Sequence, residues 1–295
     1  MNISKLFRQT LYNRFLSFIP DKLYLRLKYR KKVGRWPNLK KPVTFTEKIQ
    51  WLKLNYRNPN FCLMVDKFAV KDYVAKIIGS DYIIQTLAVW NKVDDINIST
   101  LPDQFVLKWN HDSGSIAICR DKAHFNIEDA KCKLSKGAQT NGFWYGREWP
   151  YKGVRPCIIA EKYLEDKSHP GDLPDYKFYC FDGEPRYCQV IRDRQSSETI
   201  DFYDMEWNHM PFTGLDPIAR NGKIPVARPE HLEKMIDVCQ LLANNIPFIR
   251  VDMYVVEGKI FFGELTFYPA SGFGVFSPPE WDEILGNMLK LPLSK

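Results

Sequence analysis

The stretch "RVDMYVVEGKIFFGELTFYPASG", residues 250–272, places acidic side chains on two apolar runs. A connection containing Glu257, Gly258 and Lys259 separates the runs. Three-residue hairpin loops favour one residue in the left-handed conformation, which glycine adopts at least cost. The pattern therefore predicts a β-hairpin. Because a buried carboxylate is costly unless it is paired or bound to a cation, the acids of this hairpin need an explanation.

The register of the hairpin follows from the length of its loop. With a three-residue loop, Asp252 lies directly across from Glu264, and Arg250 lies across from Thr266. A two-residue loop would shift the strands by one residue and separate the acids. Facing β-carbons lie about 4.5–5.5 Å apart, so two carboxylates there repel unless a positive charge lies between them. A hard divalent cation such as Mg²⁺ fits, and an ordinary solvated sheet face on which Arg250 neutralises one acid is the alternative.

Side chains alternate between the two faces of a strand, which predicts a core face for this hairpin. That face carries Val251, Met253, Val255, Phe261, Leu265 and Phe267. The other face is apolar near the turn and polar toward the open end of the hairpin. The acids thus belong to the polar end of the face that points away from the core.

The charge of the chain is strongly uneven. Its 295 residues are 45% hydrophobic, which is enough for a globular core, and its net charge is +7. Residues 1–60 hold 15 Lys and Arg against 2 Asp and Glu, so the rest of the chain is mildly acidic. A basic N-terminal segment indicates a local anionic partner, such as a membrane surface, an acidic glycan or a nucleic acid.

The cysteines and apolar runs bear on the compartment. The 7 cysteines form no CxxC pair, and the 5 histidines show no metal-binding spacing. Free thiols are typical of a reducing compartment. No apolar run reaches the roughly 18–20 residues of a membrane span, and the N-terminus lacks the features of a signal peptide. We expect a cytoplasmic protein.

Periodicity predicts helices in the first part of the chain and mainly strands after residue 101. Residues 3–30 read as two short helices broken at Pro20, either packed on the body or, for the first, lying at an anionic membrane surface. Further helices are expected after a cap at Thr44 or Thr46, at 66–79 and at 231–246. Strands are expected at 105–110, 156–164 and 175–194. The sum is an α+β protein.

Two upstream motifs suit a nucleotide. "FVLKWNHDSGS" places Lys108 on a strand that leads into a loop with Ser113, Gly114 and Ser115. A strand lysine and a small glycine-containing loop can hold phosphates, although a plain turn explains the same residues. "IIAEKYLED" is a β-run ending in acids that could contact a base and a ribose.

In this order the motifs resemble the ATP-grasp superfamily, and more narrowly its TupA-like branch. The matching phrases are "TFTEKIQWLKL", "DKFAV", "LPDQFVLKWNHDSGS", "DYKFYCFDGEPR" and the opening hairpin, which run from about Thr44 to Leu291. The resemblance implies two α+β subdomains that grip ATP between antiparallel sheets, preceded by a basic helical extension. It also implies an association with bacterial capsule and teichuronopeptide-type polysaccharide biosynthesis.

The resemblance assigns roles residue by residue. The implied ATP contacts are Lys67 and Lys108 for the phosphates, the loop Ser113, Gly114 and Ser115, the hinge Glu161, Lys162, Tyr163 and Leu164, Glu165 or Asp166 for the ribose, and Lys177 near the nucleotide. The implied Mg²⁺ ligands are Asp252, Glu264 and Thr266, with Arg250 and Lys108 as the catalytic cations. Thr266 departs from the superfamily, which usually has an asparagine there.

The resemblance also implies a domain division and substrate residues. Residues 1–60 form the basic helical segment, and residues 61–295 form the ATP-grasp domain. Within it, 101–165 is a smaller lid-like subdomain and 166–295 is the C-terminal subdomain with the metal site. The expected substrate residues are Arg192, Arg194, Ser271 and Gly272. Alternatively, the two arginines are ordinary solvated side chains at the end of a strand.

The expected activity is ATP- and Mg²⁺-dependent joining of a carboxylate to an amine through an acyl phosphate. The expected substrates are a uronic acid of a surface polysaccharide or its nucleotide-sugar precursor, and an amino acid or amine. One alternative is a glycosyltransferase, although the chain has no Asp-x-Asp motif. Another is a non-catalytic protein that docks on a glycan or membrane through residues 1–60. We expect no nucleic-acid partner, because no such motif accompanies the basic segment.

Overall fold

The structure is a computed structural model that describes residues 18–138, 141–165, 173–192, 198–215 and 220–292. The first predicted helix, Asp166 and Arg194 lie outside these residues. The chain forms two compact units. Unit 1 comprises residues 1–25, 58–71 and 84–164, and unit 2 comprises residues 26–57, 72–83 and 165–295. Both units are discontinuous in sequence, whereas the division predicted above uses contiguous ranges.

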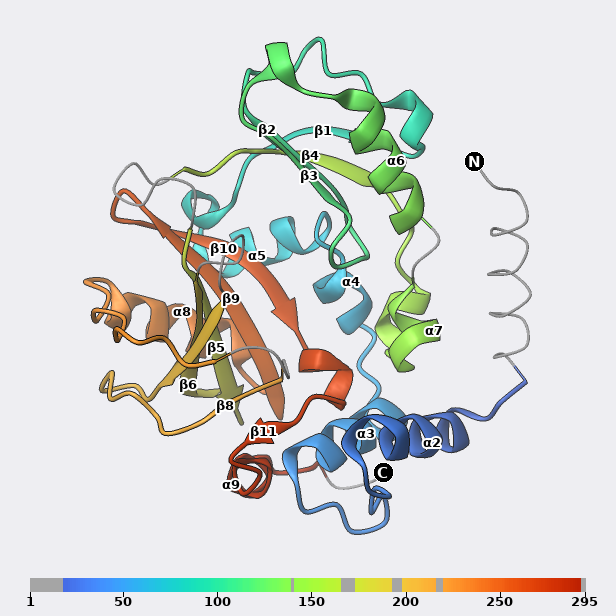
Figure 1. Ribbon diagram of the computed structural model, residues 1–295, viewed down its shortest axis with the longest axis vertical. Helices are drawn as coiled ribbons and strands as arrows, with labels where there is room; N and C mark the ends of the chain where they lie inside the picture. Colours follow the sequence, from blue (N-terminus) through green and yellow to red (C-terminus); the bar gives the residue numbers. More distant parts are fainter. Residues whose placement is uncertain (1–17, 139–140, 166–172, 193–197, 216–219, 293–295) are drawn as a thin grey trace. The chain divides into compact units, whose positions relative to one another are not determined.

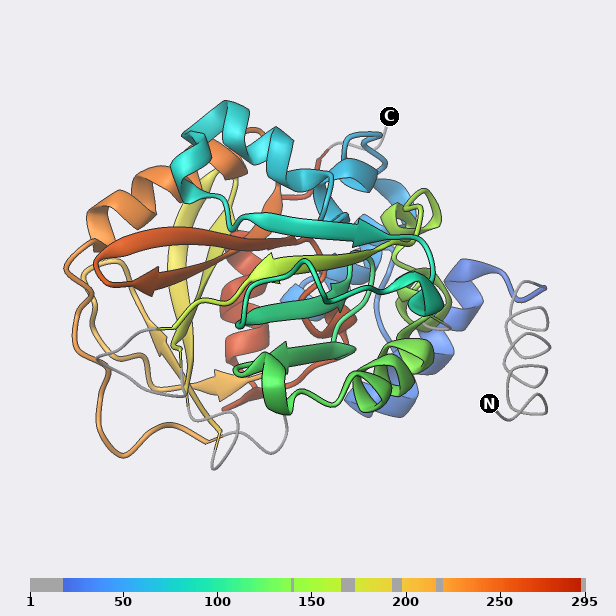
Figure 2. The same cartoon turned by 90° about the horizontal axis from the view of Figure 1, so that it is seen from above.

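Unit 1 contains a four-stranded antiparallel sheet in the order β1-β4-β2-β3 (Figure 2). Its strands are β1 (Thr86–Trp90), β2 (Phe105–Trp109), β3 (Ile116–Cys119) and β4 (Ile158–Lys162). β2 and β4 lie within the predicted strands, while β1 was not predicted. The helices assigned wholly to this unit are α4 (Phe61–Val65), α6 (Ile127–Gly137) and α7 (Gly142–Gly146).

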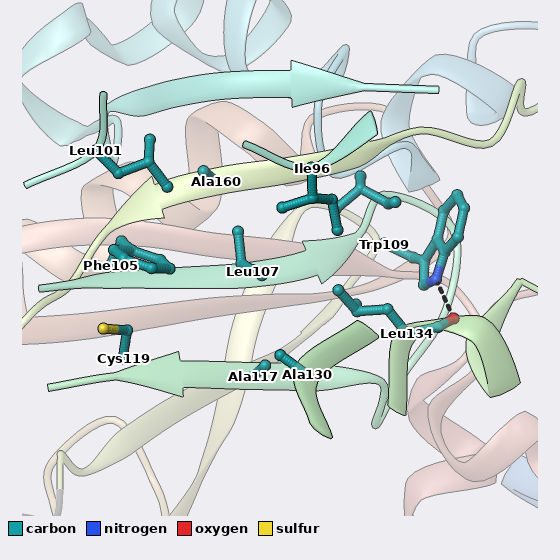
Figure 3. Close-up of a cluster of buried hydrophobic side chains, with 11 residues drawn as sticks. Ile96, Leu101, Phe105, Leu107, Trp109, Ala117, Cys119, Ala130, Leu134 and Ala160 are labelled. Atoms are coloured by element: carbon teal, nitrogen blue, oxygen red, sulfur yellow. Dashed lines mark hydrogen bonds between the residues drawn. The ribbon is translucent and has the colours of Figure 1, made fainter. Parts of the chain in front are cut away.

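The core of unit 1 lies between this sheet and α6 (Figure 3). Phe105, Leu107 and Trp109 of β2 are buried, as alternation along a strand requires. Trp109 Nε1 donates a hydrogen bond of 2.7 Å to the carbonyl of Leu134, so the one polar atom of the indole is satisfied. The same alternation puts Lys108 on the opposite face of β2, away from this core.

Unit 2 contains a five-stranded antiparallel sheet in the order β10-β9-β5-β6-β7. Its strands are β5 (Asp175–Phe181), β6 (Glu184–Arg192), β7 (Thr199–Tyr203), β9 (Phe248–Val256) and β10 (Lys259–Thr266). A small second sheet pairs β8 (Thr213–Gly214) with β11 (Phe276–Ser277). Helix α8 (Leu232–Ala243) packs on β5, β6 and β9, and α9 (Trp281–Met288) packs on α3 (Phe45–Asn55). Figure 1 labels these elements except β7. The two antiparallel sheets with helices confirm the predicted α+β class.

The structure shows where two of the predicted helices begin. Thr44 caps α3 in a capping box with Glu47, so Thr44 rather than Thr46 is the cap. The helix predicted at 66–79 is shorter, because α5 spans Val70–Ile78. Its start is delayed because the Asp66 side chain accepts from the N–H groups of Phe68 and Ala69, which forms a turn instead.

The loop of the β9–β10 hairpin is shorter than predicted. Lys259 pairs directly with Val256, so only Glu257 and Gly258 form the turn. Their φ angles are 50° and 74°, and positive values at both central residues are typical of a type I′ turn. The predicted three-residue loop is therefore wrong.

A β-bulge nevertheless brings the acids opposite each other. The register shifts between Phe262 and Glu264, and the extra residue is Gly263. Beyond it, Glu264 pairs with Asp252 and Thr266 pairs with Arg250, as predicted. A β-carbon on Gly263 would lie 3.0 Å from the carbonyl oxygen of Asp252, so a larger residue would crowd the bulge.

The bulge also corrects the predicted core face. Ile260 and Phe262 are buried between the turn and the bulge, whereas Phe261 and Val255 are only partly buried. The predicted face assumed uninterrupted alternation and therefore assigned Phe261 to the core. Leu265 and Phe267, beyond the bulge, are buried as predicted.

Candidate active site

The open end of the β9–β10 hairpin holds a cluster of charges in unit 2. Arg250 Nε lies 2.6 Å from Asp252 Oδ1, and Arg250 Nη2 lies 2.7 Å from Asp252 Oδ2. The same Nη2 lies 3.2 Å from Glu264 Oε1 and 3.1 Å from Thr266 Oγ1. The planar guanidinium thus binds one acid with two parallel bonds and also reaches the other. Arg250 contacts both acids, whereas the alternative of a solvated sheet face assumed that it neutralises only one.

Lys177 enters the same cluster from the neighbouring strand. β5 pairs with β9 so that Lys177 lies opposite Asp252, and Lys177 Nζ contacts that carboxylate. The Lys177 ammonium also lies 2.8 Å from Asp175 Oδ2. The side chain of Asp252 is 1% exposed, whereas that of Glu264 is 29% exposed. Glu264 is therefore the acid of this pair that solvent reaches.

Burial and the neighbouring charges set the ionisation of this cluster. Asp175, Asp252 and Glu264 bring three carboxylates to two cationic side chains. Burial raises the pKa of Asp252 above its usual value, although Arg250 and Lys177 pull it down. Burial by itself would lower the pKa of Arg250, but Asp252, Tyr179 and Glu264 together outweigh it and raise that pKa.

The donor set of this cluster suits Mg²⁺. The described residues contain no group of three or more His, Cys, Asp or Glu side chains arranged for a metal ion. Asp252 and Glu264 instead offer carboxylates from paired strands, with the Thr266 hydroxyl 3.4 Å from Glu264 Oε1. Mg²⁺ commonly binds one or two carboxylates and completes its shell with waters and substrate phosphates. The residues fit the ion, and their role as ligands stays a prediction.

A second charge cluster lies on the sheet of unit 1. Glu161 of β4 is buried between two lysines: Lys108 Nζ lies 2.5 Å from Oε2, and Lys71 Nζ lies 2.7 Å from Oε1. Lys71, at the start of α5, also donates to the Ile84 carbonyl at 2.8 Å and to Thr86 Oγ1 at 2.7 Å. Lys108 and Glu161 were predicted, and Lys71 was not. Its only sequence signal is a position four residues after Lys67, and its partner is far away in the sequence.

The two lysines fix the charge of this glutamate. Burial would raise the pKa of Glu161, but Lys108 and Lys71 outweigh it and hold the pKa below its usual value. Burial also lowers the pKa of Lys71, against the pull of Glu161. The cluster carries two cations and one anion, so it retains a positive charge that suits a phosphate.

Lys67 supports the loop that follows β2. Its Nζ donates to the Asp112 carbonyl at 2.9 Å, and its N–H donates to the Asn110 carbonyl at 3.0 Å. The next residues, Ser113 and Gly114, are exposed. Gly114 has a φ of 105°, and no atom lies within 4 Å of the place where a β-carbon would be. The structure thus brings Lys67 to the base of the predicted phosphate loop, of which Ser115 is the last, half-buried residue.

The predicted hinge continues from the end of β4. Lys162 is exposed, and its N–H donates to the Gln85 carbonyl at 3.0 Å. The Tyr163 hydroxyl accepts from Arg120 Nε at 3.1 Å, and Leu164 is half-buried. The start of the hinge is held on both sides, because Glu161 pairs with Thr86 of β1 and with Val106 of β2.

Arg192 is engaged in a network within unit 2. Its Nη2 lies 3.1 Å from Asp201 Oδ2 and 2.8 Å from the Ile224 carbonyl. Asp201 is fully buried and also accepts from His209 Nε2 at 2.9 Å. Sequence spacing did not indicate these partners. The substrate role of Arg192 stays a prediction, and Arg194 lies outside the described residues.

Ser271 and Gly272 lie in a left-handed turn after β10. Ala270, Ser271 and Gly272 have φ angles of 45°, 54° and 60°. The Ser271 carbonyl accepts from Lys53 Nζ at 2.6 Å, and the Gly272 carbonyl accepts from Gln50 Nε2 at 2.7 Å. Two side chains of α3 therefore hold the turn in place. The sequence analysis assigned no role to Lys53 or Gln50.

Comparison with known proteins identifies the family. The family model described as TupA-like ATPgrasp matches residues 47–290. The chain belongs to the TupA-like ATP-grasp family. This membership confirms the resemblance seen in the motifs and the predicted ATP-grasp fold. No curated protein matches the sequence.

Solved ATP-grasp structures resemble the chain more distantly. D-alanine–D-alanine ligase from Bacillus anthracis, solved with ATP, has 15% identity and a TM-score of 0.40, over 70% of this chain and 54% of its own. The corresponding enzyme from Helicobacter pylori has 12% identity and a TM-score of 0.44, over 83% and 69%. A RimK-domain ATP-grasp protein from Sphaerobacter thermophilus has 11% identity and a TM-score of 0.41, over 80% and 70%. The chain thus spans about half the length of the first of these proteins.

Two further features concern membrane spans and cysteines. Within the described residues no helix combines the length and apolar character of a membrane span. All 7 cysteines are free thiols.

Proposed function

We propose that this TupA-like ATP-grasp protein uses ATP and Mg²⁺ to join a carboxylate to an amine. The observation that carries the proposal is the hairpin cluster, in which Arg250 lies between Asp252 and Glu264. A cation-rich group in unit 1, formed by Lys71 and Lys108 on Glu161, supports it with a place for phosphate charge. No protein nucleophile is required, because phosphoryl transfer depends mainly on positioned charge.

The proposed reaction has two steps. A carboxylate oxygen of the substrate attacks the γ-phosphorus of ATP, the bond from that phosphorus to ADP breaks, and an acyl phosphate forms. The amine nitrogen then attacks the acyl carbon, phosphate leaves with the electron pair of the broken bond, and the nitrogen loses a proton. The products are ADP, phosphate and an amide.

The proposed roles of the chain follow from its charges. Lys67, Lys108 and the loop residues Ser113, Gly114 and Ser115 hold the phosphates of ATP, and the hinge residues Glu161, Lys162, Tyr163 and Leu164 meet the base. Arg250 balances negative charge on the transferred phosphoryl group, and Lys177 keeps Asp252 in place. Mg²⁺, held by Asp252, Glu264 and Thr266, would supply further charge neutralisation at the phosphates.

The proposed substrates are a uronic acid, within a surface polysaccharide or as a nucleotide-sugar precursor, and an amino acid or small amine. Arg192, Ser271 and Gly272 are the described candidates for contacts to them. The rigid left-handed turn at Ser271 and Gly272 supports this, since a preorganised backbone can orient a carboxylate. We also propose a cytoplasmic location, with residues 1–60 in contact with an anionic surface.

The test is a screen for ADP release. Uronic acids and UDP-uronic acids are supplied against a panel of amino acids and small amines, and mass spectrometry identifies the product. The proposal predicts ADP release that requires both a carboxylate and an amine, together with an amide product. Release that needs no amine would contradict it, as would activity that survives Asp252→Ala combined with Glu264→Ala.

A further inference from the structure

The N-terminal part of unit 2, with the helix that leads into it, has a one-sided charge. Residues 22–46 contain 9 Lys and Arg and no Asp or Glu. The nearest acid, Asp21, lies 3.3 Å from Arg147 Nε, so its charge is balanced locally. Glu47, just beyond, is buried and lies 2.5 Å from Arg35 Nη1. No acidic side chain within this segment offsets its cations.

Helix α2 (Asp21–Val33) places leucines in the middle of these cations. Leu23 and Leu27 are 49% and 51% exposed and lie four residues apart, so they share one side of the helix. Leu25 and Tyr29 are fully buried and anchor the opposite side. At about 100° per residue, the exposed cations flank the leucines on that outer side. These cations are Arg26, Arg30 and Lys31.

The segment after α2 adds a tryptophan to the same surface. Arg30 Nη1 donates to the Gly34 carbonyl, which turns the chain back along the helix. Trp36 then lies beside Arg26, with the guanidinium carbon 5.6 Å from the ring centroid. Trp36 is 53% exposed. We call Leu23, Leu27, Trp36 and the cations around them the basic face.

We propose that the basic face docks on the surface of an anionic lipid bilayer. Lysine and arginine are attracted to acidic headgroups, and the attraction adds up over several residues. Leucine and tryptophan side chains among the cations can insert at the headgroup boundary, where tryptophan is favoured. A polyanionic glycan or nucleic acid would match the charge but would gain little from exposed leucines. The combination favours a membrane surface, and it is independent of the proposed reaction.

The test is co-sedimentation of the full-length protein with vesicles at physiological salt. Vesicles of phosphatidylcholine alone are compared with vesicles that contain phosphatidylserine. The proposal predicts binding to the anionic vesicles only, and weaker binding at high salt. Binding to neither kind of vesicle would overturn it.

Two pairs of variants separate charge from insertion. Leu27→Gln with Trp36→Ala is expected to lower vesicle binding roughly tenfold, because it removes the inserting side chains. Arg26→Gln with Lys31→Gln is expected to lower it by roughly tenfold or more. The matched controls are Leu241→Gln, at a leucine 54% exposed on α8, and Lys133→Gln with Lys136→Gln on α6. Both controls are expected to bind as the parent protein does.

Competition distinguishes the other anionic partners. If heparin or duplex DNA binds as tightly as the vesicles, and Leu27→Gln with Trp36→Ala has no effect on vesicle binding, the face is a general polyanion site and the proposal fails. ADP release, measured in the same variants without vesicles, is expected to be unchanged. A loss of docking with retained ADP release would therefore leave the proposed reaction untouched.

Discussion

Arg250 and Asp252 form the central pair of the candidate site, with two parallel bonds of 2.6 and 2.7 Å between guanidinium and carboxylate. Both residues lie on β9, two positions apart, so their side chains share one face of the sheet. Arg250 Nη2 also contacts Glu264 and Thr266 on β10. One side chain therefore ties together every residue that we propose for the metal.

We predict that replacing Arg250 affects both stability and catalysis. Arg250→Met leaves buried Asp252 with Lys177 alone, which is expected to lower the free energy of unfolding by about 3 kcal/mol. Arg250→Lys keeps the charge but loses the parallel bonds, and it is expected to lower kcat for ADP release roughly 100-fold. Urea unfolding and steady-state kinetics measure the two effects. Full activity in Arg250→Lys would show that the planar fork has no catalytic role.

The Mg²⁺ dependence of ADP release tests the ligand assignment. Glu264→Gln is expected to raise the Mg²⁺ concentration for half-maximal activity by roughly tenfold or more, because it removes the more exposed carboxylate. Thr266→Val is expected to raise it less, and Thr266→Asn to restore the parent value or improve on it. If Thr266→Val leaves the Mg²⁺ dependence unchanged, Thr266 is not a ligand.

Lys71 is predicted to stabilise unit 1 through Glu161. Lys71→Met removes one of the two cations on a buried carboxylate and is expected to cost about 1–3 kcal/mol in the free energy of unfolding. The matched control is Lys76→Met, at an exposed position of the same helix, with an expected change within about 0.5 kcal/mol. Urea unfolding compares them. Equal stability of the two variants would contradict the role given to Lys71.

The ion triad of Glu161 also predicts a pH dependence. Since the folded-state pKa of Glu161 lies below its usual value of 4.5, the ionised form adds stability at neutral pH. That contribution is lost as the pH falls below the usual value and through the folded-state pKa. Glu161→Gln is therefore expected to be less stable at neutral pH and to lose less stability in acid. Unfolding curves with parallel pH slopes in the two proteins would refute this.

The left-handed turn after β10 gives a test of close packing. A β-carbon on Gly272 would lie 2.5 Å from Ile49 Cγ2, and the φ of 60° is already unfavourable for other residues. Gly258 has a φ of 74° but its nearest atom, His231 Nε2, lies 3.6 Å away. Gly272→Ala should thus cost about 1–3 kcal/mol more than Gly258→Ala in thermal unfolding. If the turn binds substrate, Gly272→Ala also raises KM for the carboxylate but not for ATP.

The β9–β10 hairpin was predicted from the sequence only in part. The facing of Asp252 and Glu264 was predicted from a three-residue loop, and the structure has a two-residue turn plus a bulge at Gly263. The two deviations offset each other beyond the bulge, so Asp252 and Glu264 lie opposite each other as predicted. Between the turn and the bulge the strands do not pair as predicted, and Phe261 therefore lies outside the core. A positive φ at Glu257 has little sequence signal, because glutamate rarely adopts it.

Other parts of the site depend on contacts between residues distant in sequence. Local patterns indicated the strand of Lys108 and the run of Glu161, since alternation and apolar content are visible within a few residues. The contacts of Lys71 with Glu161, and of Lys53 with Ser271, depend on how strands and helices pack, which no local pattern contains. The family resemblance supplied the roles that spacing alone left open.

The central claim is that the carboxylate of the acceptor becomes phosphorylated by ATP before an amine replaces the phosphate. Its most direct test uses a carboxylate substrate labelled with a heavy oxygen isotope, chosen from the hits of the ADP-release screen. Mass spectrometry of the released phosphate follows the label. The mechanism predicts that one labelled oxygen moves from each carboxylate into the phosphate as the amide forms. Unlabelled phosphate accompanying amide formation would contradict the acyl phosphate and with it the proposed function.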